Sequence, residues 1–241
     1  MSENISKHDE IQLKYYENQV DDYEKEGGML ERTTNRGYKR KATIIAATLG
    51  PQAQKSVLEV GAGSGLLTYF AVDTLKAGKY RAQDLSQSMV ERAGKRVQRP
   101  ELSFEVSDAN HLPHPEGTFD SVFGADIIHH LSDPVQSLTE WRRVTKTGGH
   151  ICVIESNAYN PLNFRNIGDE HEVRSFLNTD KNLKKWMEEA GWKNVKVVPA
   201  PSYTPPGPAF LVPLFTIIDK ISPSIPGWRK LTAAWVLSGE K

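Results

Sequence analysis

A short β-branched segment that ends in three closely spaced glycines constrains the fold of this chain more than any other feature. Residues 57–65 read Val-Leu-Glu-Val-Gly-Ala-Gly-Ser-Gly, and a helical pattern follows from Leu66 to Leu75. Glycines at this spacing let the backbone turn sharply and approach a ligand closely, and the N–H groups of the following helix then face that ligand. We therefore expect a strand at 56–60, a tight turn and a helix. The turn is either a ligand-binding loop or a purely structural one.

The same alternation of strand and helix continues along most of the chain. Strands are expected at 79–83, 102–106, 119–124, 151–155, 195–198 and 233–237, and helices at 5–23, 38–49, 88–98, 134–144 and 183–190. Strands that alternate with helices of about ten residues are typical of right-handed crossovers and a parallel sheet. The pattern predicts an α/β fold with a Rossmann-like, doubly wound and mostly parallel seven-stranded sheet, closed by an antiparallel last strand.

Composition excludes several classes of protein. The chain has 241 residues, with 30 Lys and Arg against 30 Asp and Glu, and this neutral balance argues against a nucleic-acid partner. A single cysteine, Cys152, excludes an internal disulfide. The first residues lack the basic start and apolar stretch of a secretory signal. We expect a cytoplasmic protein. We expect no metal, because cysteine pairs are absent and His111-x-x-His114 lacks a third ligand.

Acidic residues lie at or next to the carboxyl ends of the first three strands of the predicted sheet. Glu59 lies two residues before the first glycine, where an anionic oxygen opposes a cationic ligand and repels a pyrophosphate. Asp84 ends the second strand, from which a carboxylate can accept both ribose hydroxyls. Asp108 follows the third strand and precedes Ala109, a pair suited to an exocyclic amine beside an adenine face. A dinucleotide fingerprint would have its third glycine where this chain has Leu66, and this disfavours a nicotinamide cofactor.

Together these motifs make the chain resemble class I S-adenosylmethionine-dependent methyltransferases. The resemblance covers about residues 57–155. Beyond the glycine loop it runs through Asp84-Leu-Ser-Gln-Ser-Met89, Ser107-Asp108-Ala109, Leu112-Pro113, Gly117-Thr-Phe-Asp120, His129-His130-Leu131 and Arg143-Val-Thr-Lys-Thr-Gly-Gly149. One departure is Thr147, where the family commonly has proline before its glycine pair, and it should alter only the stiffness of that turn.

The resemblance implies a cofactor, S-adenosylmethionine, and a set of residues that bind it. Gly61, Ala62, Gly63 and Gly65 would pack against the methionine part, with Ala125 and Asp126 near the methionine and the sulfonium. Asp84 would bind the ribose, Leu85 and Met89 would lie beside the adenine, and Asp108 and Ala109 would receive the adenine amine. Glu59 and Tyr23 complete the expected cofactor set.

Candidate catalytic residues follow from the chemistry of methyl transfer. The sulfonium is already activated, so the protein has to align donor and acceptor, exclude water and, where required, remove a proton. His129 and His130 follow the fourth strand. Each is either a general base or acceptor ligand, or a residue with a structural or cofactor-packing role. In the N-terminal helix, Tyr16 and Tyr23 either face the site or dock the helix by an aromatic stripe. The basic cluster at 32–41 is either solvated or contacts an anionic acceptor or the cofactor carboxylate.

We expect one domain over residues 1–241. It would consist of an N-terminal helical lid (1–50), a cofactor-binding core (51–155), an acceptor-binding insert with the C-terminal part (156–231) and the last strand (232–241). The apolar segment 208–221 either caps the acceptor pocket and the core or lies on a membrane surface and admits a lipid-like acceptor.

Together, these expectations predict an enzyme that transfers a methyl group to an oxygen or nitrogen of a small organic molecule. The main alternative is C- or O-methylation of a lipid or quinone at a membrane surface. A nicotinamide-dependent oxidoreductase and a catalytically silent cofactor-binding module are also kept as alternatives. The oligomeric state stays open.

Overall fold

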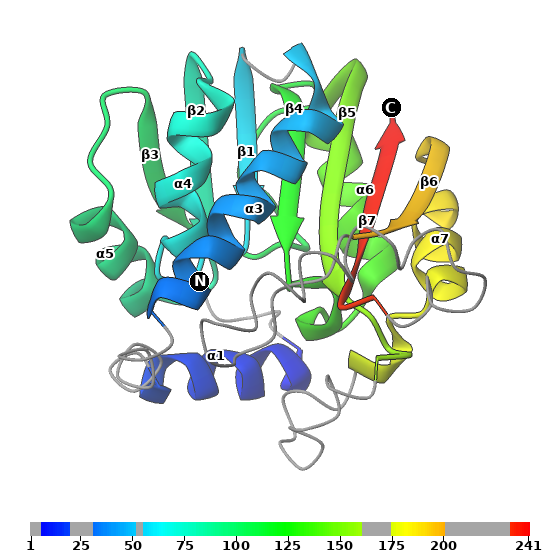
Figure 1. Cartoon of the computed structure of the whole chain (residues 1–241), viewed down its shortest axis with the longest axis horizontal. Helices are drawn as coiled ribbons and strands as arrows, with labels where there is room; N and C mark the ends of the chain where they lie inside the picture. Colours follow the sequence, from blue (N-terminus) through cyan, green and yellow to red (C-terminus); the bar gives the residue numbers. More distant parts are fainter. Residues whose placement is uncertain (1–5, 20–30, 52–54, 161–174, 201–231) are drawn as a thin grey trace.

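A single twisted sheet of seven strands forms the centre of the molecule in the computed structural model, which describes residues 6–19, 31–51, 55–160, 175–200 and 232–241 (Figure 1). The strands are β1 (Ser56–Val60), β2 (Lys79–Asp84), β3 (Leu102–Val106), β4 (Phe119–Ala125), β5 (Thr145–Ser156), β6 (Lys193–Pro199) and β7 (Ala234–Glu240). Their order in the sheet is β3-β2-β1-β4-β5-β7-β6. The last strand, β7, runs antiparallel to both of its neighbours, β5 and β6, as the sequence predicts, and the other neighbouring pairs of described strands are parallel.

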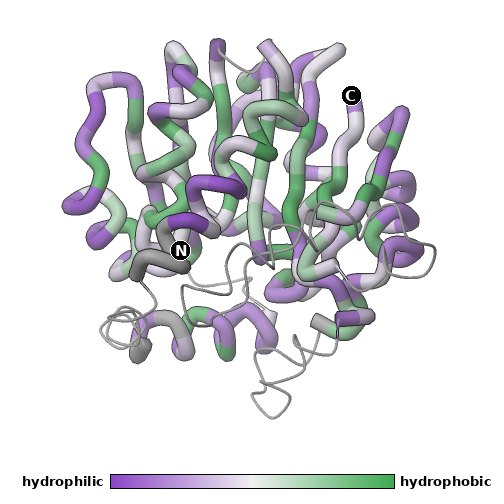
Figure 2. The backbone as a smooth tube through the Cα atoms, viewed as in Figure 1, coloured by the Kyte–Doolittle hydropathy of each residue, from purple (hydrophilic) through white to green (hydrophobic). Residues whose placement is uncertain are grey.

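Helices cover both faces of this sheet. The helices are α1 (Lys7–Gln19), α3 (Glu31–Leu49), α4 (Leu66–Leu75), α5 (Gln87–Arg96), α6 (Pro134–Val144) and α7 (Asp180–Glu189). Ile45 of α3 and Ala71 of α4 belong to the core on one face, whereas Trp141 of α6 and Leu183 of α7 belong to the core on the other face. The strands are apolar along much of their length and the exposed helix faces are polar (Figure 2). Burial of both faces explains the apolar strands.

Helix α1 lies apart from these layers, across the end of the sheet toward which the β4 arrow points (Figure 1). This is the carboxyl edge of the parallel strands, where open α/β sheets bind their ligands. Within the described residues, no helix combines the length and apolarity needed to cross a membrane. The segment 208–221, for which capping and membrane contact are the two hypotheses, lies outside the described residues.

Two elements begin well before the residue at which the sequence pattern predicts their start. Helix α3 begins at Glu31 rather than at residue 38, and β5 begins at Thr145 rather than at residue 151. The extra part of β5 contains Gly148 and Gly149, which exchange backbone hydrogen bonds with Lys241 at 3.2 and 3.0 Å. Because this pairing involves the far end of the chain, local periodicity does not reveal it.

The glycine loop between β1 and α4 makes the tight turn that its sequence indicates. Gly61, Gly63 and Gly65 all have positive φ angles, of 74°, 52° and 79°. The backbone N–H groups of Gly61 and Ala62 both donate to the carbonyl oxygen of Gln83 in β2, each at 2.9 Å. The loop is therefore held against the end of the neighbouring strand.

Substitution of Gly65 by alanine should destabilise the protein. A Cβ atom there would lie 2.9 Å from the Cβ of Ala93 and 3.0 Å from its Cα, at a φ of +79°. We expect G65A to lower the free energy of unfolding by about 2–4 kcal/mol, from left-handed strain and overpacking together. Urea unfolding at fixed pH measures this change.

Gly94 supplies the matched control on the partner helix, because its φ is not in the left-handed region and an added Cβ would lie 4.0 Å from the nearest atom, Cδ2 of Phe104. G94A should raise the free energy of unfolding by about 0.5–1 kcal/mol through helix propensity. Equal effects of the two substitutions would contradict the role of close packing at Gly65.

Candidate active site

One cavity at the carboxyl edge of the sheet brings together most of the residues that the sequence singles out. Helices α1 and α3, the glycine loop and the ends of β2, β3 and β4 all contribute to its wall. The sequence-predicted residues that line it are Gly61, Ala62, Gly63, Asp84, Leu85, Met89, Asp108, Ala109, Ala125, Asp126 and His130. Glu59, Gly65 and His129 lie behind this lining. Tyr23 is outside the described residues, and of Tyr16 only the backbone is described.

Asp84 connects the glycine loop to the end of β2. Its Oδ2 accepts the backbone N–H of Gly63 at 2.7 Å, and its Oδ1 accepts that of Ser86 at 3.0 Å. Burial raises the pKa of this carboxyl group, and the backbone hydrogen bonds oppose that shift. The carboxylate is thus oriented on the cavity wall, with lone pairs left for hydroxyl donors.

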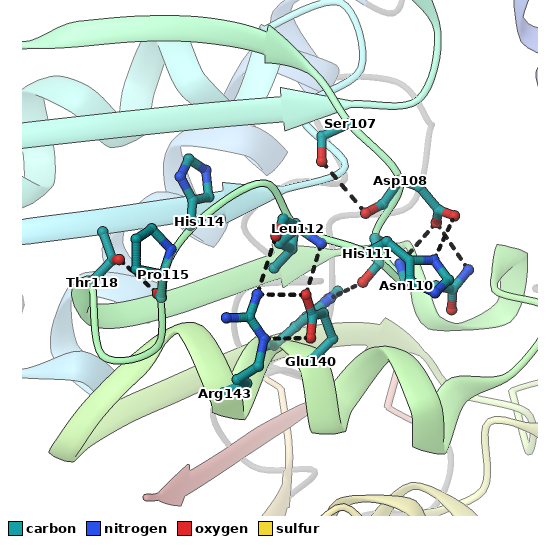
Figure 3. Close-up of polar contacts among 12 residues, drawn as sticks. Ser107, Asp108, Asn110, His111, Leu112, His114, Pro115, Thr118, Glu140 and Arg143 are labelled. Carbon is teal, nitrogen blue, oxygen red and sulfur yellow. Dashed lines mark hydrogen bonds and ion pairs between the residues drawn. The ribbon is translucent and has the colours of Figure 1, made fainter. Parts of the chain in front are cut away.

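The loop after β3 is held rigidly by its own side chains and by α6 (Figure 3). Asp108 Oδ1 accepts the backbone N–H and the side-chain amide of Asn110, at 2.8 and 2.9 Å. From α6, Ser137 Oγ donates to Asn110 Oδ1 at 2.5 Å and Trp141 Nε1 donates to the carbonyl of Ala109 at 3.2 Å. These bonds fix the position of Asp108 and Ala109 in the cavity.

A clamp of two charged residues on α6 anchors the same loop further along (Figure 3). Glu140 Oε1 accepts the backbone N–H of Leu112 at 2.8 Å, while Arg143 Nη2 donates to the carbonyl of Leu112 at 3.1 Å. Arg143 also makes two hydrogen bonds to Glu140, at 2.7 and 2.8 Å. Burial alone would raise the pKa of Glu140, but the hydrogen bonds from Arg143 and Leu112 lower it overall.

A lysine and an aspartate of opposite charge meet at the other end of the cavity. Lys41 of α3, which is 6% exposed, forms an ion pair with Asp126, directly after β4. Asp126 has a φ of +52°, and the Lys41 ammonium lies 5.4 Å from the centre of the Tyr38 ring. This end of the site therefore offers one cation and one anion beside the glycine loop.

The two adjacent histidines lie on a short 3₁₀ turn, η2 (Ile128–His130), and face differently. His130 lines the cavity. His129 is 5% exposed, and its Nδ1 lies 2.8 Å from Oε2 of Glu155. The centres of the two imidazole rings are 3.9 Å apart. Of the pair, His130 is therefore the one placed to meet a bound molecule.

Glu59 is 1% exposed and faces the interior rather than the cavity. Its Oε2 accepts hydrogen bonds from Thr68 Oγ1 and Tyr80 Oη, each at 2.8 Å, and its Oε1 has no hydrogen-bond partner within the described part of the chain. Burial raises its pKa to about 7, against the opposing effect of the two hydroxyl donors. Its protonated form therefore persists to higher pH than that of an exposed carboxyl group, which makes Glu59 a weaker anion than the sequence suggests.

Comparison with known proteins supports the interpretation of this cavity as a methyltransferase site. Residues 58–153 match the family model described as a methyltransferase domain. This part of the chain is therefore similar to a methyltransferase domain. A "SAM-dependent methyltransferase, possible histamine N-methyltransferase" from Thermotoga maritima has the same fold, with a TM-score of 0.67, 22% sequence identity and coverage of 95% of this chain and 99% of that one. The fold is that of class I methyltransferases.

Curated relatives match over part of their length. A demethylmenaquinone methyltransferase from Renibacterium salmoninarum is 28% identical over 182 residues, which cover 65% of this chain and 74% of the relative. An uncharacterised methyltransferase from Schizosaccharomyces pombe is 32% identical over 110 residues, which cover 42% of this chain and 40% of the relative. The chain thus spans less than half of the length of some relatives that it matches.

Several residues around the cavity were not predicted individually. Asp9 and Gln12 of α1 line it, and Ser132 Oγ, just beyond η2, donates to Asp9 Oδ2 at 2.9 Å. Glu155 lies behind η2 at the end of β5. An acidic residue at a strand end was the available signal for Glu155, as it was for Asp84. No comparable signal marks the α1 residues. Within the described residues, no group of three or more potential ligands is arranged to hold a metal ion.

Titration of Glu59 should make the stability of the protein depend on pH. Its pKa rises from an ordinary value of 4.5 to about 7 on folding, so the folded state binds more protons between these values and stability falls as pH rises. Between pH 5 and pH 8, the free energy of unfolding of the wild-type protein should fall by about 2–3 kcal/mol more than that of the variant in which glutamine replaces Glu59. Urea unfolding at both pH values tests this, and a wild-type-like pH dependence in E59Q would contradict it.

Proposed function

We propose that this protein transfers a methyl group from S-adenosylmethionine to an oxygen or nitrogen of a small organic molecule. The observation that carries the proposal is the single cavity in which the glycine loop, Asp84 and the rigid Asp108 loop meet His130 and polar groups of α1 and α3. A purely structural turn would not need hydrogen-bonding groups from so many elements around one cavity. The matched methyltransferase domain supports the same activity.

The charges around the cavity suggest the orientation of the cofactor. Asp84 would accept hydrogen bonds from the ribose hydroxyls, with Asp108 and Ala109 at the adenine. At the other end, Lys41 and Asp126 match the carboxylate and the ammonium of the amino-acid part, because a zwitterion presents one charge of each sign. In this interpretation the ion pair between Lys41 and Asp126 exchanges partners when the cofactor binds.

When bound, S-adenosylmethionine supplies an electrophilic methyl group. The residues of this chain then have to orient the acceptor in line with that methyl group, keep water away and accept the proton that the acceptor loses. His130 is the candidate for the last task, because a neutral imidazole on the cavity wall can take a proton from a hydroxyl or amine. Helix α1 is the candidate for shielding the acceptor, since Asp9, Gln12 and Leu13 close one side of the cavity.

Titration of the cofactor and its fragments tests the orientation. We expect S-adenosylhomocysteine to bind the wild-type protein and NADH to show no binding. D84A should weaken both S-adenosylhomocysteine and 5′-methylthioadenosine at least about tenfold, because both carry the ribose hydroxyls. K41M should weaken only S-adenosylhomocysteine, since 5′-methylthioadenosine lacks the amino-acid part. Isothermal titration calorimetry measures all three ligands.

D73A is the matched control, because Asp73 is an exposed residue of α4 that contacts Arg99 and lies away from the cavity. It should bind as the wild type does. Binding of NADH alone would favour the oxidoreductase alternative. Equal losses for both adenosyl ligands in K41M would contradict the assignment of the methionine end.

A second candidate, methylation of a quinol, is favoured by the relatives named demethylmenaquinone methyltransferase. A reduced naphthoquinone also carries a hydroxyl that a base can deprotonate. Contact of the segment 208–221 with a membrane would suit such an acceptor and belongs to this second candidate.

Acceptor assays with methyl-labelled S-adenosylmethionine separate the two candidates. Transfer to small phenols or amines in solution supports the first, and transfer to demethylmenaquinol in phosphatidylcholine vesicles supports the second. With either acceptor, H130A should lower kcat at least about tenfold and leave S-adenosylhomocysteine affinity within twofold of the wild type, as expected for a general base. An unchanged kcat in H130A would reject the role of His130 as base.

A further inference from the structure

Glu155 forms an unusually dense hydrogen-bond centre behind the cavity. It is fully buried at the end of β5. Its Oε1 accepts the backbone N–H groups of Ile127 and Ile128, at 2.7 and 2.6 Å. Its Oε2 faces Nδ1 of His129 at 2.8 Å and accepts the side-chain amide of Asn178 at 2.9 Å. One carboxyl group thus connects β5, the η2 turn and the segment that leads into α7.

The number of donors determines which way the histidine bond runs. A carboxylate only accepts hydrogen bonds, and three of its neighbours are N–H donors by their chemistry. The fourth, His129 Nδ1, must then also carry the proton. A hydrogen bond at one ring nitrogen selects the tautomer of the whole imidazole. Glu155 therefore favours the form of His129 in which Nδ1 is protonated.

The same bonds hold the turn that forms one wall of the site. The side chain of Ile127 covers the glycine loop so closely that a Cβ added to Gly61 would lie 3.1 Å from Ile127 Cγ1 and nearer still to its Cδ1. The ring of His130 lies 3.9 Å, centre to centre, from that of His129. Any shift of His129 would consequently move or reorient the histidine that lines the cavity.

We propose that Glu155 is a positioning residue for methyl transfer, which fixes the Nδ1–H tautomer of His129 and thereby orients His130 toward the acceptor. This inference rests on the proposed function for its catalytic consequence. Its structural content, the tautomer and the place of the ring, stands independently of the acceptor. Capping of two backbone N–H groups needs only one oxygen atom. The second oxygen, directed at an imidazole, is what points to this further role.

Substitution of Glu155 by glutamine tests the tautomer directly. The glutamine oxygen can still accept the two backbone N–H groups, which leaves its NH₂ group where Oε2 was. His129 Nδ1 would then face a donor and should lose its proton to Nε2. We expect ¹⁵N spectra of histidine-labelled protein, bound to S-adenosylhomocysteine, to show His129 as Nδ1–H in the wild type and as Nε2–H in E155Q.

Two further variants separate positioning from mere stability. N178A removes one donor to Glu155 but keeps the bond to His129, so it should retain the wild-type tautomer. H129N keeps an N–H donor for Glu155 without an imidazole, so it gives an independent test if E155Q does not fold. Affinity for S-adenosylhomocysteine should stay within twofold of the wild type in N178A and H129N, and in E155Q if it folds. An Nε2–H tautomer in the wild type, or an unchanged tautomer in E155Q, would overturn the proposal.

Kinetics with whichever acceptor the assays of methyl transfer identify complete the test. E155Q and H129N should lower kcat at least about tenfold with little change in KM for S-adenosylmethionine, whereas N178A should stay near the wild type. Equal rates in all variants would overturn the catalytic part. If the wild-type protein methylates none of the acceptors, the proposed function fails, and the ¹⁵N spectra still decide the tautomer.

Discussion

The attachment of the glycine loop to the end of β2 is the constraint on which the rest of the site depends. Gln83 accepts two backbone N–H groups of the loop through its carbonyl, and Asp84 accepts a third through its carboxylate. These bonds hold the loop in left-handed conformations that glycine adopts without a Cβ clash. The loop, the acid and the start of α4 consequently form one rigid unit at the switch point of the sheet, and the other parts of the cavity are arranged around it.

Three buried or half-buried acidic residues show how the surroundings of a carboxyl group determine its role. Glu59 has two hydroxyl donors in an apolar layer, and burial raises its pKa to about 7. Asp84 is held by backbone N–H groups and faces the cavity. Glu155 receives four donors and links two segments behind the cavity. Each lies near the end of a parallel strand, yet of the three only Asp84 lines the cavity.

Local patterns were sufficient to predict the order and type of most elements. Alternating apolar runs and helical periodicity indicate the strands and their crossovers, because both faces of a parallel sheet are buried by the helices between its strands. The boundaries of α3 and β5 were wrong at their N-terminal ends. In β5 the cause is pairing of Gly148 and Gly149 with Lys241, a contact between distant parts of the chain.

The sequence by itself determined the class of fold, the glycine loop and the cavity positions of Asp84, Asp108 and Ala109, because these depend on strand ends and on short motifs. Only the tertiary structure decided that Glu59 faces the interior, that His130 rather than His129 lines the cavity, and that Lys41 meets Asp126. The physical reason is that the facing of a side chain depends on its neighbours in space. A strand-end motif predicts where a residue lies in the fold. The direction of its side chain is determined by burial and by hydrogen-bond partners from other elements.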